Sequence, residues 1–153
     1  MDISLFQMTP QDIDFALRLA AAAFLGGLIG LERESHGKDA GFRTYAIVCV
    51  GSALIMILST EMYELYKGVA EVDPARIVAQ VVSGIGFLGA GAIIRFPQGI
   101  KGLTTAAGIW TAAGIGMACG LGLYKLAGFT TVLVLVILIV FSKIDQFFGG
   151  KDA

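Results

Sequence analysis

Charged and hydroxyl side chains stand at the ends of long apolar segments of this sequence, where they are placed to form a polar pocket. Glu32 and Arg33 end one such segment, and Thr104 and Thr105 begin another. A helix N-terminus favours an anion or a carboxylate, because its first N–H groups have no partner within the helix. One hypothesis is therefore a pocket with Glu32 as its acidic centre, held near the helix start at residues 102–105.

The same residues admit two other interpretations, of which we favour the first. In the first, basic residues form an interfacial ring that reaches the lipid headgroups, and Glu32 pairs with Arg33 or Arg43. In the second, Glu32 is a metal ligand, with Glu34 and Asp39 joining it from the following loop. Magnesium takes oxygen ligands and usually one or two carboxylates. The sequence shows no dedicated magnesium site, because Glu32 is the only carboxylate well placed near the pocket.

Enzyme chemistry has little support in this sequence. His36 is the only histidine, and we expect it to be solvated in a polar loop rather than to bind a ligand. No nucleophile stands at a fixed spacing from it, so no hydrolytic set is visible. We expect no enzyme activity and no cofactor.

A glycine-rich stretch from Ile77 to Ile94 has the spacing of a dinucleotide-binding turn, at Gly84, Gly86 and Gly89. Such a turn needs a strand before the glycines, a helix after them and an acidic residue about 20 positions further on. The next carboxylate downstream is Asp145, so this context is missing. The uncharged run instead has the length of a membrane-spanning helix, which needs about 20 apolar residues.

Composition also favours a membrane protein. Hydrophobic residues make up 56% of the 153-residue chain and charged residues 15%, and the mean hydropathy is +0.80. A typical soluble domain is about a quarter charged. The net charge of -1 argues against a nucleic-acid-binding protein, which would carry a basic face. We predict an all-α integral membrane protein in contact with the lipid bilayer.

Five apolar segments predict a compact bundle of five transmembrane helices in a single domain, residues 1–153. The predicted spans cover residues 13–31, 44–60, 77–94, 103–123 and 126–143. The second and fifth apolar segments are short, so we expect their helices to extend into flanking residues. Asp73 and Pro74 mark the start of the third helix, as a capping residue and a first helical residue.

Basic residues predict the orientation of this bundle. Cytoplasmic loops are enriched in Lys and Arg, and the connections after the first, third and fifth spans carry most of them. We predict the N-terminus outside and the C-terminus in the cytoplasm. Asp2 and Asp12, rather than a basic patch, precede the first span, so we expect no cleavable signal peptide.

Small residues recur at helical spacing in several spans and allow helix backbones to approach closely. We interpret them as contacts within the bundle or between subunits of a homo-oligomer. The positions are Gly26, Gly30, Gly84, Gly86, Gly89, Gly108, Ala112, Gly116 and Gly120. The alternative is that thin glycine walls line a pore. Cys49 and Cys119 lie at different predicted depths, so we expect packing residues rather than a disulfide.

A second polar group lies at the opposite ends of the predicted spans. Asp14 and Arg18 are four residues apart in one helix, and we expect them to pair. Arg76 and Gln80 lie at the start of the third span. The Gln80 amide is about one turn inside the membrane, where its donors and acceptors need partners.

Four ordered stretches resemble the MgtC/SapB family of bacterial inner-membrane proteins. They are GGLIGLERE, AGFRTYAIVCVGSAL, DPARIVAQVVSGIGFLGAGAI and KGLTTAAGIWTAAGIGMACGLGLY, at residues 26–34, 40–54, 73–93 and 101–124. The resemblance implies a multi-pass inner-membrane protein associated with growth at low magnesium and with survival of pathogens in host cells. It also implies regulation more than transport, through contacts with other membrane proteins such as the proton-translocating ATP synthase.

The polar motif positions of the family fall largely on the residues singled out above, whose polar side chains are costly to place in or beside a membrane span. They are Glu32, Arg33, Arg43, Thr44, Arg76, Gln80, Ser83, Thr104 and Thr105. Longer family members carry a soluble C-terminal domain after the last span. This chain ends at Ala153, so we expect a short form without the functions of that domain.

Two functional hypotheses follow. In the first, the protein is a membrane-embedded regulator whose glycine faces bind a partner's helices or another copy of the chain. In the second, it is a small transporter or channel for magnesium or another cation, with Gln80 and Glu32 marking the path. Ion flux through the purified protein would separate the two.

Overall fold

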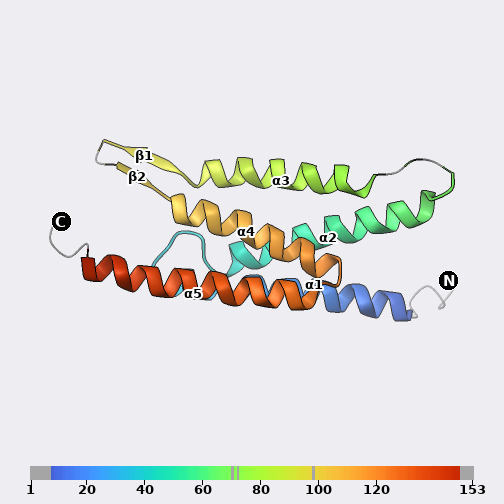
Figure 1. The fold of residues 1–153 in the computed structure, drawn as a ribbon, viewed down its shortest axis with the longest axis horizontal. Coiled ribbons are helices and arrows are strands. Elements are labelled where there is room, and N and C mark those ends of the chain that lie inside the picture. The colour runs from blue at the N-terminus through green and yellow to red at the C-terminus, as the bar shows by residue number, and fades with distance from the viewer. Residues whose placement is uncertain (1–7, 70, 72, 98, 149–153) are drawn as a thin grey trace, which may run out of the picture.

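The structure is a computed structural model that describes residues 8–69, 71, 73–97 and 99–148. Within these ranges it contains five long helices that lie side by side along one axis (Figure 1). They are α1 (Pro10–Ser35), α2 (Phe42–Tyr66), α3 (Pro74–Gly91), α4 (Leu103–Gly120) and α5 (Tyr124–Phe148). All five are long and apolar enough to cross a membrane. The predicted all-α membrane fold is therefore confirmed, whereas the orientation of the termini stays a prediction.

Capping residues define the starts of two helices. At α1, Thr9 and Asp12 form a reciprocal capping box around Pro10, which supplies partners for N–H groups that have none within the helix. At α3, the Asp73 side chain accepts a hydrogen bond of 2.9 Å from the backbone N–H of Ala75. Pro74 follows as the first helical residue. The third helix thus begins where its sequence signal predicts.

A short antiparallel hairpin joins α3 to α4 and changes the helix ends there. Strand β1 (Ile94–Phe96) pairs with β2 (Gly99–Lys101), with Arg95 opposite Ile100. The prediction that the third helix continues to residue 94 is wrong, because α3 ends at Gly91. Arg95 and Lys101 lie on strands rather than at helix ends.

Gly102 makes the turn from the hairpin into α4. Its φ of +90° is in the left-handed region, which favours glycine because a side chain there is strained. A Cβ atom at this position would also collide with the carbonyl oxygen of Ala92. The hairpin can therefore lead directly into the first turn of α4.

Helices α1, α2 and α4 form the tightest part of the bundle. A Cβ atom on Gly26 would lie 2.6 Å from Cys49 Sγ, and one on Gly120 would lie 2.6 Å from the Ala53 carbonyl oxygen. Such contacts require glycine, because no side chain fits between the backbones. Three more of the predicted packing glycines lie at equally close contacts, Gly30, Gly108 and Gly116. Ala112, Cys49 and Cys119 are buried in the same core, and both cysteines are free.

The glycines of α3 are packed differently. Gly89 makes an ordinary contact, since a Cβ atom on it would lie 3.6 Å from the Ala106 carbonyl oxygen. A Cβ atom on Gly84 or Gly86 would have no neighbour within 4 Å. Among the described residues, the bundle contact predicted for these two glycines is not formed.

Candidate functional site

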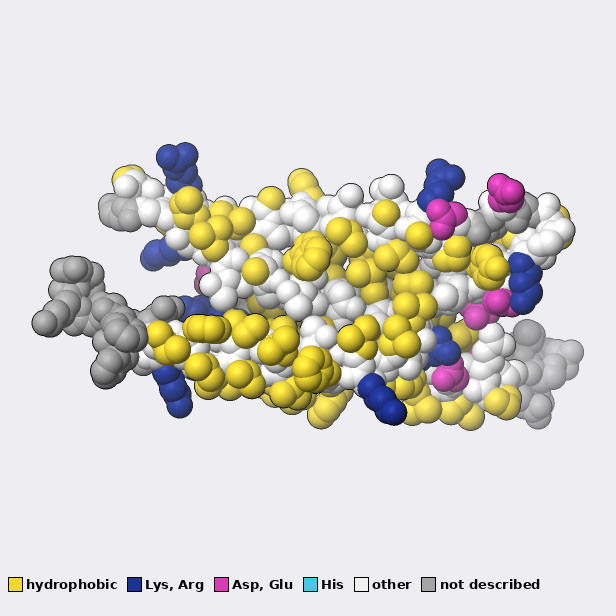
Figure 2. Space-filling model, in the orientation of Figure 1, with side chains coloured by type: hydrophobic (Ala, Val, Ile, Leu, Met, Phe, Trp, Pro, Cys, Tyr) yellow, Lys and Arg dark blue, Asp and Glu magenta, His cyan; other side chains and the backbone are white. Residues whose placement is uncertain are grey.

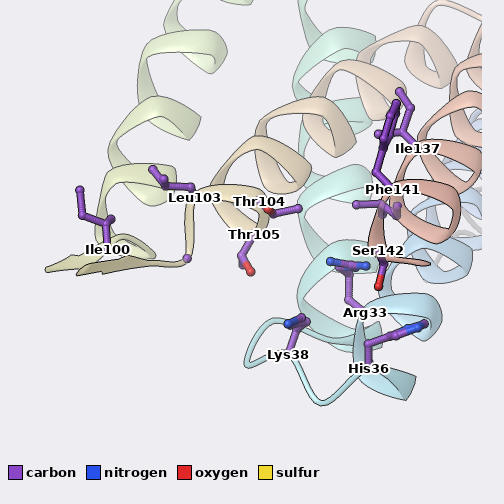
Figure 3. Close-up of a pocket in the computed structure, with 12 residues that line it drawn as sticks. Arg33, His36, Lys38, Ile100, Leu103, Thr104, Thr105, Ile137, Phe141 and Ser142 are labelled. Carbon is purple, nitrogen blue, oxygen red and sulfur yellow. The ribbon is translucent and has the colours of Figure 1, made fainter. Parts of the chain in front are cut away.

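A cavity of about 700 Å³ opens at the end of the bundle that carries the hairpin (Figure 3). The C-terminal end of α1, the loop after it, the N-terminal end of α4 and the C-terminal half of α5 surround it. The cavity is lined by Arg33, His36, Lys38, Ile100, Gly102, Leu103, Thr104, Thr105, Ile137, Leu138, Phe141 and Ser142. The structure therefore brings the end of the first span and the start of the fourth span to one site.

Arg33 is the charged residue most deeply buried at this site. Its side chain is only 4% exposed and pairs with Glu32, which is 7% exposed. The Arg33 Nη2 group donates to Glu32 Oε1 at 2.7 Å, and Nε donates to Oε2. Burying two charges is tolerated when they are paired and hydrogen-bonded. Of the two predicted partners of Glu32, the structure selects Arg33, whereas Arg43 is exposed on α2.

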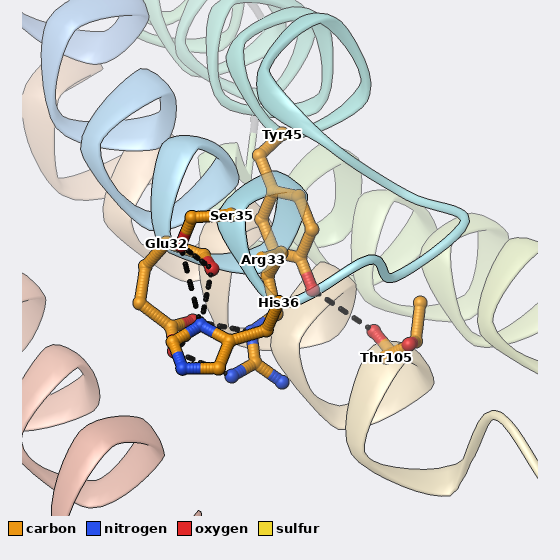
Figure 4. A network of polar contacts seen from close by, with 6 residues as sticks. All are labelled: Glu32, Arg33, Ser35, His36, Tyr45 and Thr105. Atoms are coloured by element: carbon orange, nitrogen blue, oxygen red, sulfur yellow. Dashed lines mark hydrogen bonds and ion pairs between the residues drawn. The ribbon is translucent and has the colours of Figure 1, made fainter.

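His36 completes the surroundings of Glu32 (Figure 4). Its Nδ1 atom lies 2.9 Å from the Glu32 backbone oxygen and 3.1 Å from Glu32 Oε1. The Ser35 hydroxyl donates to the same backbone oxygen at 2.8 Å. The side chain of His36 is 41% exposed, which agrees with the expectation of a solvated histidine, although its Nδ1 atom also contacts Glu32.

Glu32 is not the acidic centre of the cavity. Its two carboxylate oxygens face Arg33 and His36, and it does not line the cavity. Glu34, the second candidate oxygen ligand, accepts a hydrogen bond of 2.9 Å from the backbone N–H of Phe42 and so supports the start of α2. Within the described ranges, no three His, Cys, Asp or Glu side chains form a group suited to a metal ion. The charged side chains that line the cavity, Arg33 and Lys38, are cationic instead of acidic.

The first turn of α4 forms the opposite side of the cavity. Gly102 is its N-cap and offers no side-chain hydrogen bond, so the helix start keeps N–H groups without an intrahelical partner. Thr104 and Thr105 lie beside these groups and line the cavity. The Tyr45 hydroxyl, from fully buried Tyr45 on α2, lies 3.4 Å from the Thr105 carbonyl oxygen and donates to it. This contact joins α2 to the start of α4.

Several residues of the site were missed by sequence reasoning. Tyr45 carried a usable signal, because a phenol inside an apolar segment needs a hydrogen-bond partner. Lys38 lies in the loop after α1, and its charge alone does not indicate that it lines the cavity. Ile137, Phe141 and Ser142 gave no signal, because their role depends on how α5 returns along α1 and α4.

The opposite end of the bundle contains a second polar arrangement. Arg18 Nη2 lies 2.6 Å from Asp14 Oδ2, which is the pairing that their spacing predicts. Arg18 Nη1 also donates to the Gly120 carbonyl oxygen at 2.7 Å. This bond satisfies a carbonyl group at the C-terminal end of α4. The link from α1 to α4 was not predicted.

The remaining predicted polar residues lie outside the cavity. Arg76 and Gln80 line a shallow pocket of about 370 Å³ at the start of α3, at the end of the bundle away from the hairpin (Figure 1). Ser83 is exposed further along α3, and Thr44 is exposed near the start of α2. The structure thus divides the predicted polar set between two ends of the bundle and one exposed helix.

Comparisons with known proteins fit this architecture. The MgtC family model matches residues 19–147, from the middle of α1 to the end of α5. The chain belongs to the MgtC family. The resemblance that four sequence stretches indicated is therefore confirmed, and the match makes this chain a multi-pass membrane protein of that family.

Two relatives within the MgtC family show the extent of the similarity. The putative magnesium transporter YhiD of Escherichia coli strain K12 is 47% identical over 133 residues, which cover 86% of this chain and 62% of YhiD. Protein MgtC of Salmonella typhimurium is 45% identical over 93 residues, which cover 61% of this chain and 37% of that protein. The chain thus spans less than two thirds of the length of these relatives. No solved structure matches the chain.

Proposed function

We propose that this MgtC-family chain is a regulatory protein of the bacterial inner membrane. It supports adaptation to low magnesium by binding helices of other membrane proteins. The observation that carries the proposal is the unpartnered surface of α3, which combines polar side chains with open glycines at membrane depth.

Helix α3 is the least buried of the five helices. Only 11% of its apolar window is buried, compared with 44% for α4. Gln80 and Ser83 are exposed, although an amide or hydroxyl facing lipid without a partner is unfavourable. A neighbouring helix would supply partners for both side chains.

A groove beside these residues offers space for such a helix. It has a volume of about 420 Å³ between α2 and α3. Its lining includes the apolar side chains of Ile47, Ile55 and Leu88. Gly51 and Gly84 also line it and leave space where a side chain would otherwise project into the groove. Because a helix backbone approaches closely where side chains are small, we assign the groove to one transmembrane helix of a partner protein, with a polar group opposite Gln80.

The relatives support the link to magnesium. YhiD is described as a putative magnesium transporter, and its sequence matches this chain along most of the chain's length. Figure 2 shows Lys and Arg at both ends of the bundle, but Asp and Glu mainly at the end away from the hairpin. The hairpin end is therefore the more basic one, which supports the predicted orientation because basic residues are enriched on the cytoplasmic side. Alkaline phosphatase fused after residue 148 should therefore stay inactive, and fused after Lys67 it should be active.

Cation transport is the second candidate function, and the description of YhiD favours it. The geometry favours it less. Arg33 and Lys38 line the main cavity and would repel a divalent cation. The core between α1, α2 and α4 is apolar, with Ala22, Ile115 and Cys119 buried in it. Magnesium flux into liposomes that contain only this protein would favour transport over regulation.

The partner-helix proposal is tested by Gly84→Leu, which fills the groove without touching the core. Gly114→Leu is the matched control, because Gly114 also has open space around it but lies on α4 outside the groove. We expect Gly84→Leu to reduce growth at low magnesium and to abolish a photo-crosslink from position 80 to another membrane protein. Gly114→Leu should preserve both. Unchanged growth and crosslinking in Gly84→Leu, or crosslinks only between copies of this chain, would contradict the proposal.

A further inference from the structure

We propose that the cavity between α1, α4 and α5 binds a phosphate group, carried either by an anionic lipid headgroup or by free inorganic phosphate. This site lies at the hairpin end of the bundle, away from the groove of α3. The inference goes beyond the proposed regulatory function and does not depend on it.

The charge of the lining selects an anion. Arg33, His36 and Lys38 face the cavity, and none of its described lining residues is a carboxylate. Glu32 neutralises Arg33 from behind, through Nε and Nη2. Lys38 is exposed and has no salt bridge among the described residues. The lining therefore keeps a positive charge that an anion would balance.

Arg33 also presents hydrogen-bond donors that the protein does not use. A guanidinium group has five N–H donors, and within the described residues no hydrogen bond uses the Nη1 group of Arg33. The side chain is 96% buried, since its exposed fraction is 4%. Because Arg33 lines the cavity, a ligand oxygen there would accept a charge-assisted hydrogen bond from this free group.

The first turn of α4 presents a second set of donors to the same space. Helix α4 has 18 residues and begins at Gly102 without a side-chain cap. Figure 3 shows Thr104 and Thr105 on this turn across from Arg33 and Lys38. Helix N-termini bind phosphate through free N–H groups and the helix dipole. A tetrahedral phosphate group has oxygens for both sides of the cavity at once, which a planar carboxylate lacks.

The apolar side of the cavity bears on where the phosphate group comes from. Ile137 and Phe141 on α5 face the same space and are 44% and 55% exposed. The cavity lies at the end of the spanning helices, where lipid headgroups are found. A lipid would place its phosphate group between Arg33 and Thr104 and its acyl chains along α5, whereas inorganic phosphate would leave the apolar wall uncovered.

Two probes distinguish these sources with the purified full chain in a neutral detergent. Isothermal titration with sodium phosphate, against sodium chloride of equal ionic strength, measures free phosphate. Native mass spectrometry with phosphatidylglycerol, against phosphatidylcholine, counts retained lipid.

Lys38→Gln removes a cation from the cavity. Arg95→Gln is the matched control, because Arg95 is an exposed cation at the same end that does not line the cavity.

We expect saturable binding of one of the two probes. Lys38→Gln should weaken this binding about tenfold, as expected for the loss of one charge-assisted contact, whereas Arg95→Gln should retain it. Phosphatidylglycerol binding identifies a lipid site, and phosphate binding identifies a site for the free ion. The double variant Glu32→Gln/Arg33→Gln removes the buried pair without leaving a lone charge, and it should lose binding while keeping its helical circular dichroism. Absence of saturable binding to folded protein, or equal loss in Lys38→Gln and Arg95→Gln, would overturn the proposal.

Discussion

Glycines lie on two sides of α2, and the neighbouring helices approach closely on only one of these sides. Between α1, α2 and α4, Gly26 and Gly116 lie against the backbone or side chain of Cys49, with no room for a Cβ atom. Between α2 and α3, Gly51 and Gly84 have open space and border a groove. The same residue type therefore completes one interface inside the chain and leaves the other available to a partner. Glycine spacing permits a close approach, and the neighbouring helix determines whether it occurs.

The largest effect is expected from filling the tight interface. In Gly116→Leu, the new side chain would collide with the backbone of Cys49, which no rotamer change relieves. We expect a loss of stability of about 3 kcal/mol or more, the upper range for overpacking, and little folded protein. Thermal unfolding monitored by circular dichroism measures the change.

Gly114→Leu is the control for this variant, because Gly114 lies two residues earlier with open space around it. Its unfolding free energy should change by no more than about 0.5 kcal/mol, as at most surface positions. Equal destabilisation by both variants would show that leucine in α4, rather than the close contact, is responsible.

A large effect is also expected from breaking the buried ion pair at the end of α1. Arg33→Ala leaves the Glu32 carboxylate, which is 7% exposed, without its main partner. Breaking one side of a buried pair costs about 3–5 kcal/mol. The double variant Glu32→Gln/Arg33→Gln should recover most of this loss in the same unfolding measurement. Failure of the double variant to recover it would mean that packing of the Arg33 stem, not charge, is what matters.

A smaller effect is expected at the other end of the tight interface. Arg18→Gln removes the hydrogen bond to the Gly120 carbonyl oxygen and the pair with Asp14. The Arg18 side chain is 23% exposed and that of Asp14 is 45% exposed, so water compensates for part of the loss. We expect a destabilisation of about 1 kcal/mol. Asp14→Asn keeps the contact to α4, and it should therefore destabilise the protein less than Arg18→Gln does.

Much of the fold could be predicted because the membrane imposes it. Each apolar segment must satisfy its own backbone hydrogen bonds in lipid, which requires a helix. The hairpin was missed because Ile94 and Ile100 continue the apolar pattern, so that hydropathy does not separate a short strand from a helix end. The turn at Gly102 depends on a left-handed backbone conformation, which the φ angle reveals but the sequence pattern does not.

The candidate site could be predicted only in part. Residues such as Arg33 and Thr105 were prominent because polar groups in lipid are costly. The hypothesis of an acidic cavity is wrong, because the Glu32 carboxylate faces Arg33 and His36, whereas Lys38 lines the cavity. Rotamers and loop paths determine such choices, and they leave no periodic pattern in a sequence.

The sequence by itself determined the membrane class, the number of helices, the start of α3 at Asp73 and the MgtC family. These features depend on hydropathy and on local capping, which act within a single segment. Only the tertiary structure decided which glycines meet a neighbouring helix, which arginine pairs with Glu32, and that α5 completes the cavity. Because apolar residues cover most of every helix here, the rotation of each helix is set by its contacts with neighbours rather than by its own pattern.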